Sequence, residues 1–192
     1  MIINPEVLGL LSLLVLLCSL VVIFLLRRRH TAEHQLKKVL QPYIRNEIKQ
    51  VVIPDGIGGL IEIEQLILLD NGLFIVQNYN TDGNIFGGDA IDQWTQLVRG
   101  RSFKFANPLR HIMSSKQALS SLVPGVPIFY RVIFVGDVQF PKGRPEGVST
   151  LHSLAEDLTL LNDKVINNSK VKFAWERIMR IARKDDHAAK LR

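Results

Sequence analysis

Acidic, amide and phenol side chains alternate along two neighbouring segments in the middle of the chain. Glu62 and Glu64 lie two residues apart in one β-rich segment, and Gln77 and Tyr79 lie two residues apart in the next. Because successive strand residues point to opposite faces, each pair shares one face of its strand. Such a face can simply be solvated, or its carboxylates can supply the hard oxygen ligands that a cation such as Mg²⁺ prefers.

The two segments are predicted to form a β-hairpin. They cover residues 60–69 and 73–79, and Asn71-Gly72 between them is the strongest short hairpin signal that a sequence offers. A turn with these two residues at its centre pairs Glu64 with Tyr79. The hairpin would therefore gather four polar side chains on one face: Glu62, Glu64, Gln77 and Tyr79.

The surrounding segments predict helices mixed with strands. Thr31 is a candidate N-cap for a helix that Pro42 ends, and Asn107-Pro108 precedes a helical stretch to about Leu122. The apolar run at 128–135 is typical of a central strand. Further expected elements are a short strand at 51–53 and two terminal helices at 151–163 and 169–183. This spacing favours an α/β fold.

Together these residues resemble the nuclease-related domain (NERD) family over roughly residues 32–136. The similarity rests on matching motifs in matching order: Ala32-Glu33 with Leu36 and Leu40, Glu62-Ile63-Glu64-Gln65, Asp70 to Val76, Gly83 to Gly87, Trp94, and Phe105 to Leu109. The resemblance implies a restriction-endonuclease-like mixed sheet flanked by helices.

The resemblance also implies a site, and this chain departs from it. Nucleases of this kind use an acidic residue on a helix, an Asp on one strand and Glu-x-Lys on the next, which hold Mg²⁺ and position the attacking water. Glu33 and Glu64 match the first two positions and are the candidate metal ligands. Gln77 and Tyr79 stand at the Glu and Lys positions, and neither supplies the missing charge. The implied site is therefore degenerate, with Mg²⁺ as a cofactor only if some activity survives.

Each of these residues also has a plainer interpretation. Glu33 near a helix start is a favourable partner for the helix dipole, and Glu62 with Glu64 can be one solvated face. The glycine-rich loop at 55–59 lacks the ending of a phosphate-binding loop, so a turn is expected. The five histidines show no metal-binding spacing. The basic amphipathic stretch at 169–184 is a core-packing helix or a contact with lipid or nucleic acid.

The N-terminus predicts a membrane anchor. Residues 7–26 carry no charge and are long enough to span a bilayer core of about 30 Å. Arg27, Arg28 and Arg29 follow directly and predict that the chain after them stays in the cytoplasm, with the N-terminus outside. We therefore expect a single-pass protein of a bacterial inner membrane. The expected organisation is an anchor at 1–28, a NERD domain at 29–140, and a helical extension at 141–192 packed on that domain.

The net charge limits the classes of possible partner, and the cysteine content limits the possible disulfides. The net charge is +6, and Glu6 is the only charged residue before Arg27, so the rest of the chain carries +7. Such a domain suits DNA, RNA or anionic lipid headgroups. Cys18, the one cysteine, lies inside the predicted span, which excludes an intramolecular disulfide. Three functions stay open: a nucleic-acid-binding module with impaired chemistry, an Mg²⁺-dependent nuclease using Glu33 and Glu64, and a membrane-associated protein-interaction scaffold.

Overall fold

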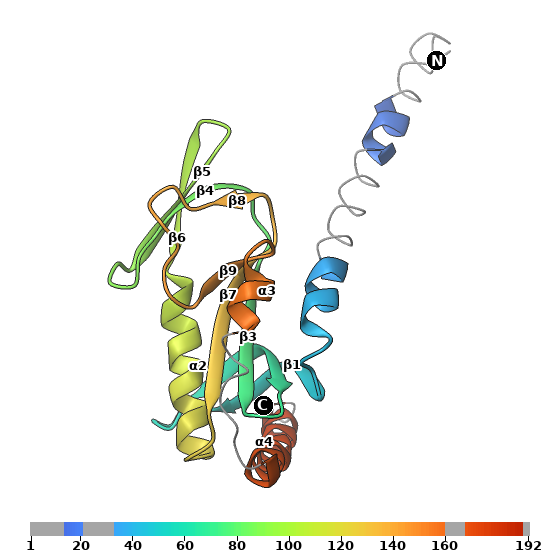
Figure 1. Cartoon of the computed structure of the whole chain (residues 1–192), viewed down its shortest axis with the longest axis vertical. Coiled ribbons are helices and arrows are strands. Elements are labelled where there is room, and N and C mark those ends of the chain that lie inside the picture. Colours follow the sequence, from blue (N-terminus) through green and yellow to red (C-terminus); the bar gives the residue numbers. More distant parts are fainter. Residues whose placement is uncertain (1–13, 21–32, 160–167, 190–192) are drawn as a thin grey trace, which may run out of the picture.

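The protein has an α/β fold built on two mixed sheets (Figure 1). The computed structural model describes residues 14–20, 33–159 and 168–189. The larger sheet has the order β1-β2-β3-β7-β9 and the smaller one β6-β5-β4-β8. The larger sheet contains β1 (Asn46–Pro54), β2 (Leu60–Leu68), β3 (Leu73–Tyr79), β7 (Ile128–Phe134) and β9 (Val148–Thr150). The smaller contains β4 (Gly83–Phe86), β5 (Gln93–Val98), β6 (Arg101–Ala106) and β8 (Val138–Gln139).

Helices cover both faces of the larger sheet. One core cluster joins the sheet to α2 (Pro108–Leu122) and α4 (Asn168–Ala189). The other joins it to the helix at 33–40 and to α3 (Leu154–Thr159). The central strands β3 and β7 run parallel to each other. Strands covered on both faces are apolar at almost every position, which explains why the run at 128–135 predicted a central strand.

Asn107 sets the start of α2, as the sequence predicts. Its side-chain oxygen accepts a hydrogen bond from the backbone N–H of Leu109 at 2.9 Å, and Pro108 occupies the first turn, where no N–H is needed. The same side chain donates to the carbonyl of Ile91 at 2.7 Å. Asn107 therefore caps the helix and also holds the loop between β4 and β5.

The turn between β2 and β3 differs from the prediction. Leu68 pairs with Leu73, so four residues connect the strands, and the backbone N–H of Leu69 donates to the carbonyl of Gly72. The prediction of a two-residue turn was wrong. The cause lies in the neighbouring strand: Leu73 donates to the carbonyl of Pro127, and a Cβ on Gly72 would lie 2.5 Å from that oxygen. The glycine is needed for this close approach rather than for a tight turn.

Strands β1 and β2 change their alternation part of the way along. Their register runs from Lys49 opposite Gln65 to Val51 opposite Ile63, with Gln50 and Glu64 between these pairs. Gln50 adopts a φ of 52°, a left-handed conformation that side chains rarely take. As a result Ile63 and Leu66, three residues apart, both join the core cluster of α2 and α4. This shift decides on which face Glu64 lies.

The two sheets meet where β3 and β7 end. Each of these strands continues into the smaller sheet, β3 into β4 and β7 into β8. At the crossing, Gly136 passes so close to the carbonyl of Thr81 that a Cβ would overlap with it. A cluster of aromatic rings fills the junction: Tyr79, Trp94, Phe105, Phe134 and Phe140.

The ends of the chain are described only in part. Residues 14–20 are helical and exposed, while the rest of the predicted span at 7–26, and Thr31, lie outside the described residues. Among the parts of the chain that are described, no helix is long and apolar enough to cross a membrane. Beyond residue 140, α3 begins at Leu154 rather than at residue 151, the last residues of the helix predicted at 151–163 lie outside the described ones, and β9 adds a strand to the larger sheet. The domain boundaries at 28 and 140 stay predictions.

Candidate functional site

A cleft of about 600 Å³ opens between the helix at 33–40 and the larger sheet. Glu33 and Glu64 both line it, so the structure brings together the two carboxylates singled out in the sequence. Glu33 comes from the helix and Glu64 from β2. Polar side chains of neighbouring elements complete the wall: Lys37, Glu47, Lys49, Gln65, Asn78 and Asn80.

The Glu64 carboxylate is held by the next strand. One oxygen accepts a hydrogen bond from the side-chain amide of Asn78, and the other accepts from the backbone N–H of Asn78, each at 3.2 Å. A second hydrogen bond orders the side chains of Gln65 and Glu47 beside it, because the Gln65 amide donates to the Glu47 carboxylate at 2.9 Å. Since Glu64 itself is exposed, this carboxylate is fixed in direction and open to solvent.

Gln77 and Tyr79 lie on the other face of the sheet. The Tyr79 ring packs against Phe134, with centroids 5.5 Å apart, and against Phe105 at 6.2 Å. The Gln77 amide donates to the Tyr79 hydroxyl at 3.3 Å. The prediction that these two residues share a face with Glu64 was wrong. The physical reason is the change of alternation at Gln50 and Glu64. The four-residue turn moves the pairing of β2 with β3 by two residues and therefore leaves the faces unchanged.

The surroundings of Tyr79 also remove it from acid–base chemistry near neutral pH. Burial among the aromatic rings raises the pKa of its hydroxyl above the ordinary value of 10.0, and the negative charge of Glu64 adds to the rise. A neutral phenol with a pKa in that range is neither a cation nor an efficient base at pH 7. Tyr79 therefore acts as a core aromatic residue in this fold.

Asn78 and Asn80 are the site residues that sequence reasoning missed. They alternate with Gln77 and Tyr79, and they line the cleft beside Glu64. The side-chain oxygens of Gln77 and Asn78 are buried and accept no hydrogen bond from any described residue. The sequence shows that the residues of β3 alternate between two faces, so either Gln77 and Tyr79 or Asn78 and Asn80 can share a face with Glu64. Deciding between these pairs requires the change of alternation in β1 and β2, which the sequence of β3 does not reveal.

The donor groups of the cleft are not arranged as the metal site of the family motif. Glu33, Glu47 and Glu64 supply carboxylates, whereas Asn78 and Asn80 supply neutral amides. Within the described ranges, no group of three or more His, Cys, Asp or Glu side chains is placed to hold a metal ion. Mg²⁺ prefers several hard anionic oxygens and near-octahedral geometry. The cleft instead combines three acids, which are not grouped around one point, with the ammonium groups of Lys37 and Lys49.

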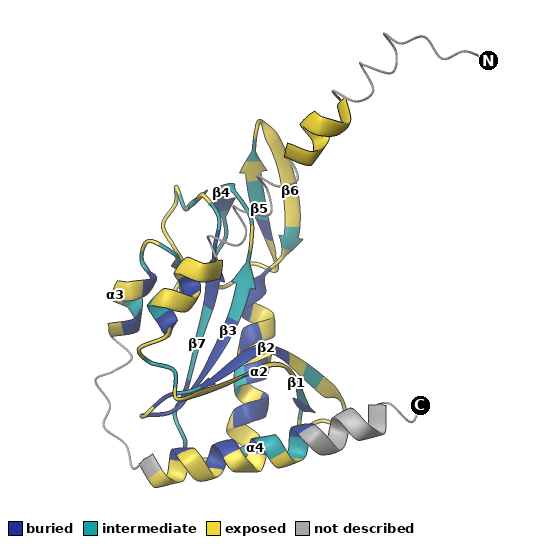
Figure 2. Cartoon of the chain, turned by 90° about the vertical axis from the view of Figure 1, so that its right-hand side faces the viewer, coloured by how far each residue is buried: buried dark blue, intermediate teal, exposed yellow. Residues whose placement is uncertain are grey.

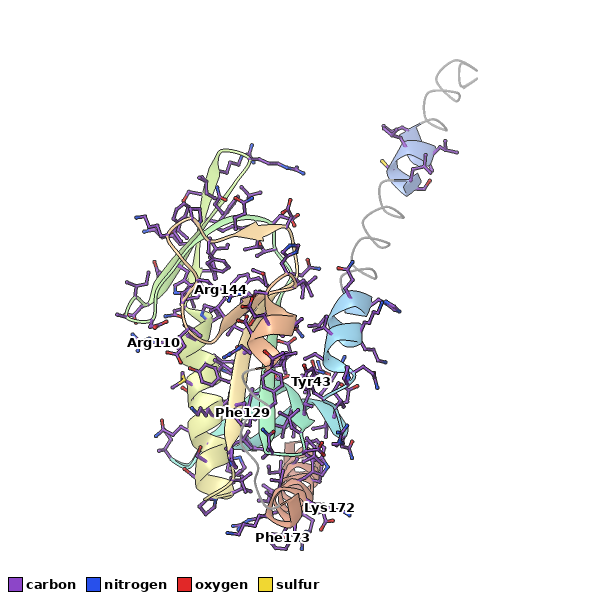
Figure 3. The ribbon with its side chains drawn as sticks, viewed as in Figure 1. Tyr43, Arg110, Phe129, Arg144, Lys172 and Phe173 are labelled. Carbon is purple, nitrogen blue, oxygen red and sulfur yellow. The ribbon has the colours of Figure 1, made fainter. Side chains whose placement is uncertain are left out.

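The other candidate motifs have structural roles. In the loop at 55–59 the Asp55 carboxylate accepts from the backbone N–H groups of Ile57 and Gly59, at 2.9 and 2.8 Å. Those N–H groups already have an anionic partner, so the expected turn is confirmed. In α4 the residues Val171, Trp175 and Ile178 are buried, while Figure 3 shows Lys172 and Phe173 on the outward side of the helix. The core-packing interpretation of this amphipathic stretch is confirmed.

The fold and the cleft define a class: an α/β domain with a mixed sheet, consistent with a nuclease-like fold. The model of the nuclease-related domain (NERD) matches residues 28–135, which is more than half of the chain. The chain therefore belongs to the NERD family.

Part of the chain is also similar to a curated protein. An uncharacterized protein of Bacillus anthracis is 24% identical to this chain over 84 residues, which make up 44% of this chain and 40% of that protein. The match thus spans about two fifths of the relative's length. No solved structure is significantly similar to the chain.

Proposed function

We propose that this protein is a membrane-anchored NERD domain that binds nucleic acid without cleaving it. One observation supports the loss of catalysis. Gln77 and Tyr79 stand at the Glu and Lys positions of the family motif, but they pack on the face of β3 opposite the Glu64 carboxylate. A nuclease of this type needs its charges around one scissile phosphate. The cleft lacks the lysine and the second strand acid of that motif.

The charge of the chain supports binding to a polyanion. Residues 27–192 carry a net charge of +7. Lys and Arg contacts to phosphates release counterions, and this provides most of the sequence-independent affinity for nucleic acid. A cationic NERD domain whose catalytic charges are lost retains the means to hold its former class of substrate.

An electrophoretic binding assay on the full-length chain in neutral detergent tests this proposal. DNA and RNA oligonucleotides are each titrated at a low and a high salt concentration. We expect binding at low salt that weakens steeply as salt rises. Absence of binding to both nucleic acids at low salt would overturn the proposal, and partners recovered by crosslinking would then favour the scaffold role.

The shared cleft of Glu33 and Glu64 keeps one second candidate, an Mg²⁺-dependent nuclease. Cleavage that requires Mg²⁺ or Mn²⁺ and disappears in Glu64→Ala would establish this activity and overturn the non-catalytic proposal. Cleavage that persists in Glu64→Ala would come from a contaminant or another site. Glu62→Ala is the matched control, because it removes an exposed carboxylate of the same strand, two residues away from Glu64.

The anchor at residues 7–26 belongs to the proposal as well. It rests on the uncharged apolar run and on Arg27, Arg28 and Arg29 after it. We expect the full-length chain to stay with membranes after extraction at alkaline pH, and we expect removal of residues 1–26 to release it. Protease treatment of sealed inner-membrane vesicles of both orientations tests the cytoplasmic location, since the domain should be cut only where the cytoplasmic side faces out.

A further inference from the structure

The hairpin of β5 and β6 presents a positively charged surface without acidic residues. Residues 93–106 contain Arg99, Arg101 and Lys104 and no acidic residue. All three cations are exposed, and none is in an ion pair with another described residue. The hairpin therefore presents charge that the fold itself does not neutralise.

The hairpin is also built as a firm projection. Its strands form six consecutive pairs, from Gln93 opposite Ala106 to Val98 opposite Arg101. Arg99 and Gly100 form its turn with φ values of 50° and 73°, the left-handed conformations that match the twist of a two-residue hairpin. At its base Trp94 and Phe105 anchor it in the aromatic cluster. Figure 2 shows both strands extending beyond the larger sheet.

Strand β6 forms the open edge of its sheet. It neighbours only β5, and residues 101–104 are exposed in succession. By alternation, Arg101 and Phe103 lie on one face and Lys104 lies on the other. The Phe103 ring is 48% exposed and lies in the strand between the cations Arg101 and Lys104.

We propose that this hairpin binds single-stranded nucleic acid along the edge of β6. Cations on both faces and at the turn can contact successive phosphates of a flexible chain that wraps an edge, whereas a flat bilayer surface would meet only one face. Phe103 can stack on an unpaired base, and base–aromatic stacking needs the exposed base faces that a duplex hides. The inference rests on the proposed nucleic-acid binding and specifies where it occurs and which form is preferred.

Fluorescence anisotropy on the full-length chain in neutral nanodiscs tests the inference. The probes are a labelled single-stranded oligonucleotide of mixed sequence and its duplex, each titrated at several salt concentrations. The hairpin variant combines Arg99→Gln, Arg101→Gln and Lys104→Gln and keeps Gly100. The matched control removes three exposed cations of α4 with Lys170→Gln, Lys172→Gln and Arg177→Gln. Thermal unfolding checks that each variant is folded.

The parent should bind the single strand more tightly than the duplex. The hairpin variant should lose at least about ten-fold in affinity for the single strand, and its salt slope should fall by about 2, since each lost phosphate contact contributes about 0.7 for a single strand. Phe103→Leu should weaken binding by about five-fold without changing the slope. The α4 control should stay within about two-fold of the parent.

Each contrary outcome has a distinct meaning. If the parent binds neither probe at low salt, the proposed function fails. If the parent binds and the hairpin variant binds equally well, the proposed function stands and the hairpin inference is overturned. The inference is also overturned if the hairpin variant keeps oligonucleotide binding but loses co-sedimentation with phosphatidylserine vesicles, because the hairpin would then be a lipid contact.

Discussion

The two faces of the larger sheet differ sharply where β3 ends. On one face Tyr79 joins a closely packed group of aromatic rings with Phe134 and Phe105. On the other face Asn78 holds the exposed Glu64 carboxylate at the wall of an open cleft. Adjacent residues of one strand thus serve stability and a candidate site. A family motif with alternating positions therefore has meaning only when the face of each position is known.

The comparison predicts that the aromatic face is critical for stability. Phe134 is fully buried between Tyr79, Trp94 and Phe140. Phe134→Ala should lower the free energy of unfolding by about 3–5 kcal/mol, because it leaves a cavity that the stacked rings cannot fill. Urea denaturation followed by circular dichroism measures this. Phe173→Ala on α4, where the ring is 60% exposed, should change the free energy by less than about 0.5 kcal/mol. Equal losses in both variants would contradict the assignment of the faces.

A lysine introduced on either side of β3 compares the two faces directly. Tyr79→Lys restores the family's residue type but places an ammonium among aromatic rings, so it should lower the free energy of unfolding by about 2 kcal/mol. Asn80→Lys places the same group at the exposed cleft and should change it by less than about 0.5 kcal/mol. Thermal and urea unfolding of both variants measure the difference. A reversed order would mean that Tyr79, not Asn80, faces the cleft.

A carboxylate added on either face of β3 should affect metal binding only on the cleft side. Asn78→Asp adds a carboxylate beside Glu64 and on the wall shared with Glu33, so it should bind Mn²⁺ measurably more tightly than the parent by isothermal titration. Gln77→Glu adds the same charge on the aromatic face and should leave Mn²⁺ affinity unchanged. Tighter binding in Gln77→Glu alone would restore the shared face of Glu64 and Gln77 that the sequence predicted.

The smallest effect concerns pH. Burial first and the Glu64 charge second raise the pKa of Tyr79 above 10.0, and similar causes raise the pKa of Tyr130. A raised folded-state pKa gives stability that is complete below the unfolded pKa of about 10 and is lost as pH rises through the folded value. The free energy of unfolding should therefore fall at alkaline pH, and the fall should be smaller in Tyr79→Phe. Urea denaturation from about pH 8 to pH 11 measures it; an unchanged fall in Tyr79→Phe would contradict a buried hydroxyl.

The elements that local chemistry determines were predictable from the sequence. Asn107-Pro108 started α2, Pro42 followed the helix that ends at Leu40, and the apolar run at 128–135 became the central strand β7. The smaller sheet was not foreseen as strands, because β4 to β6 are short and β6 is polar and exposed. Such an edge ribbon has no strong hydrophobic alternation for a pattern to detect.

The candidate site was only partly predictable for a non-local reason. The sequence indicated Glu33 and Glu64, and both line the cleft. Which positions on β3 share a face with Glu64 depended on the change of alternation at Gln50, which lies in another strand and acts through the pairing of β1 with β2. A one-residue change of alternation moves every following side chain to the other face. Asn78 and Asn80 could not be chosen over Gln77 and Tyr79 without these long-range contacts.

Gly136 limits how this fold can vary. A methyl group at this position would overlap with the carbonyl of Thr81, and backbone atoms there cannot move aside without displacing both strands that lead into the smaller sheet. Every other residue type has a Cβ, whatever the size or polarity of its side chain. A library of all substitutions at residue 136 should therefore return glycine alone among folded variants. The crossing of the two strands thus depends on the absence of a single carbon atom, and variation in the smaller sheet must be sought on the far side of that point.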